Sequence, residues 1–210
     1  MPTNDRTSSV ISLHAEAELA VAAASCVSAT ALQAGMRAPL FTLIDIQGKD
    51  VALERLLDAG PVVLSFFRGG WCSYGARSLA DFSSLARELK ALGASAVAIG
   101  PRVKPLRPTN HTGTFAELCD VDMHVARTYG LTFNLPFSLR PLYQQLGYQP
   151  PEENDAADSW LVPVPAMYLL DREGVIVLAS VELDYRKRFD AASLLSALKA
   201  VSPKKRERRA

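Results

Sequence analysis

Three cysteines are the residues of this sequence whose type could support redox chemistry: Cys26, Cys72 and Cys119. A cysteine acts as a nucleophile in its thiolate form, which the start of a helix or a nearby cation favours. Cys72 has both, because it precedes a stretch with helical periodicity and lies between Arg68 and Arg77. We therefore predict that Cys72 is the redox nucleophile. The alternative is a small buried apolar residue, since free cysteines are often buried.

The other two cysteines have simpler interpretations. Cys26 lies in the predicted N-terminal helix, where we expect it to be a packing residue. Cys119 ends a predicted strand and is either a core residue or a resolving thiol that reaches Cys72 from the same sheet edge. The three residues are too far apart to be a disulfide framework, which favours a reducing cytoplasm.

Other catalytic chemistries have little support. His14, His111 and His124 lie on different predicted elements without the spacing of metal ligands, so we expect no metal site. Gly69 and Gly70 alone are too weak a signal for a phosphate-binding loop. We therefore expect no cofactor.

The composition is that of a globular protein. The chain has 210 residues, of which 49% are hydrophobic and 21% charged, and a net charge of +1, so we expect no nucleic acid partner. No apolar run reaches the roughly 18 residues of a membrane span. Charged residues such as Glu16 and Glu18 interrupt the N-terminal apolar stretch, which predicts an amphipathic helix rather than a signal peptide. We predict an N-terminal helical extension (1–32), one domain (33–202) and a basic, disordered tail (203–210).

The elements around Cys72 form a recognisable unit. Residues 61–67 are a continuous apolar run, as in a strand buried on both faces. A long helix follows Cys72, and residues 95–99 form a second buried strand, so we expect a parallel strand–helix–strand crossover. Cys72 then lies at the carboxyl end of a strand, where open α/β sheets bind their ligands. The apolar face of that helix consists of Leu79, Phe82, Leu85, Leu89 and Leu92.

The rest of the chain predicts an α/β fold with a mixed central sheet flanked by helices. The expected helices are 9–26, 53–57, 122–129, 137–146 and, capped by Asp190, a last one to 200. The expected strands are an edge strand at 39–44, and strands at 114–118, 166–170 and 175–180, with turns at 47–48 and 171–174. Residues 101–113 and 150–158 are expected loops.

Four motifs, in order, resemble the alkyl hydroperoxide reductase/thiol-specific antioxidant family. The turn Phe66–Gly75 resembles the FxRGGWCPYC turn of its peroxiredoxin-like branch. The other similar segments are Gly35–Leu43, Asp122–Gly130 and Ser159–Ala166, and the resemblance spans about residues 33–200.

This resemblance implies a thioredoxin fold with insertions and an antioxidant, thiol-dependent oxidoreductase that reduces hydroperoxides or exchanges disulfides. It implies a thioredoxin-like or glutathione reductant, with a homodimer as a possible assembly, whereas the lack of a membrane-length apolar run predicts no membrane partner. Pro165 matches the cis-proline that faces the cysteine of thioredoxin-like sites. The active-site turn carried over in this way consists of Arg68, Gly70, Trp71, Tyr74 and Gly75, together with Pro165.

Two departures from the family pattern affect the mechanism. The second cysteine of the turn is replaced by Gly75, so Cys72 would act in a one-cysteine mechanism, and we expect Gly75→Cys to restore a CxxC pair. Aligned through Trp71, the peroxidatic cysteine of true peroxiredoxins falls on Gly75, its preceding threonine on Cys72, and the peroxide-binding arginine at or near Pro165. The alternative function is therefore a binding or scaffold protein without turnover.

Overall fold

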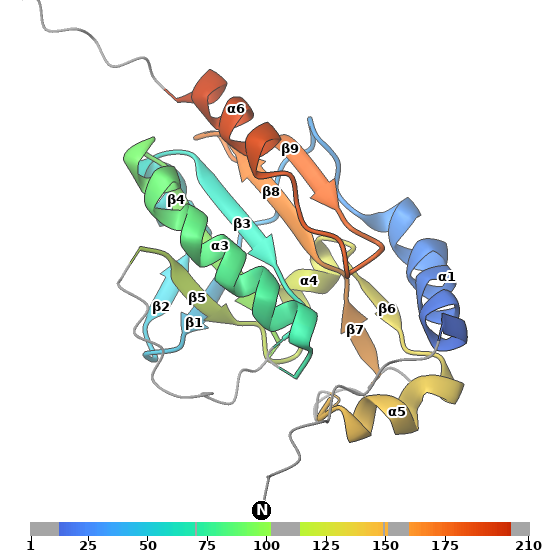
Figure 1. The fold of residues 1–210 in the computed structure, drawn as a ribbon. Coiled ribbons are helices and arrows are strands. Elements are labelled where there is room, and N and C mark those ends of the chain that lie inside the picture. Colours follow the sequence, from blue (N-terminus) through green and yellow to red (C-terminus); the bar gives the residue numbers. More distant parts are fainter. Residues whose placement is uncertain (1–12, 70, 102–113, 149, 151–159, 203–210) are drawn as a thin grey trace, which may run out of the picture.

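The computed structural model of the protein describes residues 13–69, 71–101, 114–148, 150 and 160–202 (Figure 1). Some predictions concern residues outside these ranges. They are the start of the first helix, Gly70, His111, most of the two expected loops, and the basic tail.

A mixed sheet of seven strands forms the centre, in the order β2-β1-β5-β4-β3-β8-β9 (Figure 1). β3 runs parallel to β4, and β4 runs parallel to β5, whereas the other neighbouring strands are antiparallel. The predicted parallel crossover and the mixed sheet are thereby confirmed. The strands are β1 (Thr42–Asp45), β2 (Asp50–Ala52), β3 (Val62–Phe66), β4 (Ser95–Gly100), β5 (Ala116–Cys119), β8 (Ala166–Leu170) and β9 (Ile176–Val181).

Strand β3 is buried on both faces, as its apolar run predicted. On one face, Val63 belongs to a core formed with α3 (Ser73–Ala91) and α6 (Ala191–Val201). On the other, Leu64 belongs to a core that includes α1 (Leu13–Thr30) and α4 (His124–Thr128). Successive residues of a strand point to opposite faces, so an all-apolar strand requires cover on both sides.

Three short strands were not predicted. β6 (Thr132–Asn134) and β7 (Leu161–Pro163) form a second, two-stranded sheet. β2 forms a hairpin with β1, so the segment expected at the edge has neighbours on both sides, and β2 is the edge. Strands of three residues are too short to show an alternating pattern.

The remaining helices differ from expectation mainly in their bounds. The first helix ends at Thr30 rather than residue 26, and the segment predicted at 137–146 is a 3₁₀ turn, η1 (Phe137–Leu139), followed by α5 (Arg140–Gln145). α2 (Leu53–Ala59) is two residues longer than predicted. Asp190 caps α6 as predicted, accepting from the backbone N–H groups of Ala192 and Ser193. Among the described helices, none is long and apolar enough to cross a membrane.

Candidate active site

Cys72 occupies the N-cap position of α3, where the sequence placed it. Its backbone is extended (φ −100°, ψ 124°), and its N–H donates to the carbonyl oxygen of Gly69 at 3.3 Å. The thiol makes no capping hydrogen bond, and the residue is only 8% exposed. The sulfur therefore lies in a sheltered position at the positive end of a 19-residue helix.

Arg68 is a buried cation beside this turn. The residue is 3% exposed, and its Nη2 donates to the Tyr143 hydroxyl at 2.6 Å. Nε is buried and has no hydrogen-bond partner. None of the carboxylates in the described part of the chain forms an ion pair with Arg68. Because burying an unpaired charge is costly, an anion formed next to this guanidinium would be stabilised.

Aromatic rings enclose the guanidinium. Its Cζ lies 4.0 Å from the ring centroid of Tyr185, 5.3 Å from that of Trp71 and 5.7 Å from that of Tyr143. Trp71 also packs against Tyr148, at 5.3 Å between centroids, and Tyr185 packs against Tyr74 at the same distance. These ring faces are attractive for a cation, so they hold Arg68 in place without neutralising it.

The tyrosine hydroxyls of this enclosure stay protonated at neutral pH. Burial raises the pKa of Tyr143, although the Arg68 cation and its hydrogen bond oppose the shift. Burial likewise raises the pKa of Tyr185 to about 12, against the opposing effect of Arg68, and Cys72 adds a small upward contribution. Cys72 makes the same kind of contribution to the raised pKa of Tyr143.

Arg68, Trp71 and Tyr74, which the sequence predicted for this turn, all meet here, whereas Tyr143 and Tyr185 were not predicted. Tyr143 comes from α5 and Tyr185 from the segment between β9 and α6, far from the turn in sequence. One signal was available: Tyr185 lies between charged residues on both sides, and an aromatic residue in such a segment is unusual for a solvated loop.

Gly75 packs directly against the turn. A Cβ atom at position 75 would lie 2.5 Å from the carbonyl oxygen of Gly69, closer than side-chain carbons approach backbone atoms. A cysteine there therefore does not fit unless the Gly69 backbone moves. The predicted restoration of a CxxC pair by Gly75→Cys therefore requires a shift of the Gly69 backbone, because the glycine allows α3 to lie close to the turn.

The Val164–Pro165 peptide bond is trans, so the predicted cis bond is wrong. Trans is the usual state of X–Pro bonds, and sequence similarity to a cis-proline motif does not determine the isomer. Pro165 precedes Ala166, which pairs with Phe66 at the end of β3. It therefore lies at the same end of the sheet as the Cys72 turn.

The structure pairs neither Cys26 nor Cys119 with Cys72. Cys119 ends β5 opposite Gly100 of β4, and β4 separates it from β3. At about 4.8 Å per strand, β3 and β5 lie roughly 10 Å apart. Cys26 is exposed on α1, and all three thiols are free.

Metal-binding chemistry finds no support in the described residues, which contain no group of three or more His, Cys, Asp or Glu side chains that could hold an ion. His124, at the start of α4, has no such neighbours.

Comparison with known proteins is consistent with this architecture. The model of the AhpC/TSA family matches residues 34–179, and no curated protein sequence matches the chain. The peroxidoxin BcpB of Mycobacterium tuberculosis superposes with a TM-score of 0.58 at 21% identity, covering 81% of this chain and 98% of that one. The Plasmodium vivax 2-Cys peroxiredoxin gives 0.59 at 12% identity (81% and 82%), and the Xanthomonas campestris peroxiredoxin Q gives 0.54 at 18% (81% and 99%). The fold is thus the thioredoxin fold in its peroxiredoxin form, with an additional N-terminal helix.

Proposed function

We propose that this chain, which belongs to the AhpC/TSA family, is a thiol peroxidase that uses Cys72 as its only catalytic cysteine. The observation that carries the proposal is the buried Arg68 guanidinium, which has no carboxylate partner in the described residues and contacts the ring of Trp71, the residue before Cys72. A thiolate on Cys72 would supply the missing negative charge.

In the proposed reaction, the Cys72 thiolate attacks one oxygen of a hydroperoxide. The sulfur–oxygen bond forms as the oxygen–oxygen bond breaks, so the sulfur becomes a sulfenic acid. The leaving alkoxide or hydroxide takes a proton from water and departs as an alcohol or water. The Arg68 Nε–H, which has no partner, and the Tyr143 hydroxyl, which accepts from Arg68 and can still donate, are suited to bind the peroxide oxygens.

An external thiol completes the cycle. It condenses with the sulfenic acid to give a mixed disulfide and water, and a second thiol then releases Cys72 as the reduced thiol. We place this role outside the chain, on a thioredoxin-like protein or glutathione, because position 75 of the turn is a glycine and offers no second thiol. Cys119 lies two strands from β3 and is the alternative resolving thiol. An intramolecular disulfide between Cys72 and Cys119 in the oxidised protein would support that role.

The test is to trap the sulfenic acid. The reduced protein is treated with one equivalent of hydrogen peroxide in the presence of dimedone, and the modified cysteine is identified by peptide mass spectrometry. We expect the adduct on Cys72, no adduct there in Cys72→Ser, and an unchanged Cys72 adduct in the control Cys26→Ser, whose thiol is exposed on α1.

The contrary result is equally clear. If Cys72 gives no adduct, and peroxide is consumed no faster by the wild type than by Cys72→Ser, the peroxidase proposal fails. The protein would then be better described as a thioredoxin-fold binding or scaffold protein.

A further inference from the structure

We infer that the segment between β9 and α6, residues 182–190, is a strap that limits the size of the molecules that reach Cys72, and that a contact with α1 holds it closed. The inference depends on the proposed function for what those molecules are: a small hydroperoxide passes the closed strap, whereas a protein thiol requires it to open. Access to the thiol itself can be measured whether or not Cys72 reacts with peroxide.

The strap packs Tyr185 against the turn that carries Cys72. The Tyr185 ring lies 4.0 Å from the Arg68 Cζ and 5.3 Å from the centroid of Tyr74, two residues after Cys72. Tyr185 is 6% exposed, and its hydroxyl is buried without a partner. A molecule too large to pass this ring must move the strap before it can touch the sulfur.

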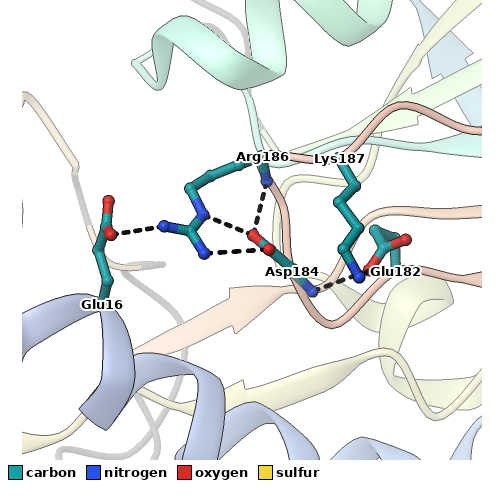
Figure 2. A network of polar contacts seen from close by, with 5 residues as sticks. All are labelled: Glu16, Glu182, Asp184, Arg186 and Lys187. Carbon is teal, nitrogen blue, oxygen red and sulfur yellow. Dashed lines mark hydrogen bonds and ion pairs between the residues drawn. The ribbon is translucent and has the colours of Figure 1, made fainter. Parts of the chain in front are cut away.

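Charged contacts hold the strap from outside (Figure 2). Arg186 Nη1 pairs with Glu16 Oε2 of α1 at 2.6 Å, and its Nε and Nη2 contact both carboxylate oxygens of Asp184, at 2.7 and 3.0 Å. The strap is also attached at its two ends. The Glu182 N–H donates to the Pro165 carbonyl at 2.9 Å, and Arg188 pairs with Asp81 of α3 at 3.2 Å.

The contact with α1 is suited to opening. The Arg186 side chain is 43% exposed and that of Glu16 is 18% exposed, so water and salt weaken their attraction. The buried contacts of Tyr185 stabilise the closed strap most, and the Arg186–Glu16 ion pair adds a smaller stabilisation. Both partners of this ion pair, Arg186 and Glu16, lie outside residues 34–179, the part of the chain that the family model matches.

The experiment compares two uncharged alkylating reagents of different size, iodoacetamide and a polyethylene-glycol maleimide, and follows the Cys72 peptide by mass spectrometry. In Arg186→Gln and in Glu16→Gln, we expect the bulky reagent to react about two- to five-fold faster than with the wild type, as the loss of an exposed ion pair allows. The rate with iodoacetamide should not change. Added salt should accelerate the bulky reagent with the wild type but not with Arg186→Gln.

Further variants separate gating from a general loosening of the fold. Tyr185→Ala should accelerate the bulky reagent roughly tenfold or more, and Tyr185→Phe, which keeps the ring, should react like the wild type. The matched control is Lys187→Gln, which removes a charge from the same strap, where its ammonium pairs with Glu182 at 3.9 Å rather than with α1. Bulky-to-small rate ratios that stay at the wild-type value in Arg186→Gln, Glu16→Gln and Tyr185→Ala would overturn the inference. A gate that opens as expected around a Cys72 inert to peroxide would overturn the proposed function alone.

Discussion

At the scale of single residues, the main finding is the environment of Arg68. A guanidinium is permanently charged, and here it is surrounded by rings and a neutral hydroxyl rather than by a carboxylate. Burying such a group lowers the stability of the folded protein, and an anion that forms beside it offsets part of this loss. A residue of this kind should therefore make opposite contributions to stability and to reactivity.

Replacing Arg68 tests that opposition. Arg68→Met removes the charge and keeps an apolar stem, so we expect the melting temperature to stay the same or rise. The rate constant of Cys72 with hydrogen peroxide should fall roughly 10- to 100-fold, as the loss of a hydrogen bond to a charged group implies. Arg68→Lys should be intermediate, because it keeps the charge without the planar fork. Stopped-flow kinetics and thermal unfolding measure the two quantities, and an Arg68→Met variant that reacts as fast as the wild type would remove Arg68 from the mechanism.

At the scale of elements, the start of α3 depends on its close approach to the preceding turn. Gly69 has a positive φ of 103°, and its carbonyl oxygen both accepts from the Cys72 N–H and lies where a side chain at position 75 would begin. The turn and the first turn of the helix are therefore a single packed unit. The sequence motif names these glycines, but the contact between them follows only from their positions in space.

A side chain at position 75 should disrupt this unit. Alanine has the better helix propensity by about 1 kcal/mol, yet we expect Gly75→Ala to lower the free energy of unfolding by about 1–3 kcal/mol, as overpacking does. Urea denaturation measures the change. The matched control is Ser84→Ala at an exposed position of α3, where alanine meets no such obstacle and should be neutral or slightly stabilising. Equal stability of Gly75→Ala and the wild type would mean that the Gly69 backbone moves aside at little cost in free energy, which would contradict this prediction.

The start of α6 gives a prediction about pH. Hydrogen bonds from the Ser193 side chain, the Ser193 N–H and the Ala192 N–H lower the pKa of Asp190 below its usual value of 3.8. A carboxyl group with a lowered pKa in the folded state stabilises the protein above its unfolded pKa, and this stabilisation is lost as the pH falls through the folded pKa. The wild type should therefore be more stable than Asp190→Asn at pH 7, and the difference should shrink below about pH 4, because the neutral amide still caps the helix but does not titrate. Urea unfolding at several pH values checks this, and a pH-independent difference would contradict it.

At the scale of the whole molecule, the sequence predicted most of the fold and part of the site. The apolar run of β3 and the spacing to β4 were sufficient for the parallel crossover, since such a strand must be covered on both faces. β6 and β7 were not predicted, because each has only three residues and their paired residues lie about thirty positions apart in the sequence. The enclosure of Arg68 was equally hidden, since Tyr143 and Tyr185 reach it from separate elements and nothing local to either residue specifies the meeting.

The antiparallel pairing of β3 with β8 also bears on how the chain is made. β3 can join β4 soon after both leave the ribosome, but its other neighbour is encoded about 100 residues later. At synthesis rates of about 5–20 residues per second, that delay is roughly 5–20 s. During this time the nascent chain carries an apolar strand with one open edge, the kind of surface on which chains aggregate. The strand that leads to Cys72 is thus also the segment for which protection by chaperones during translation matters most.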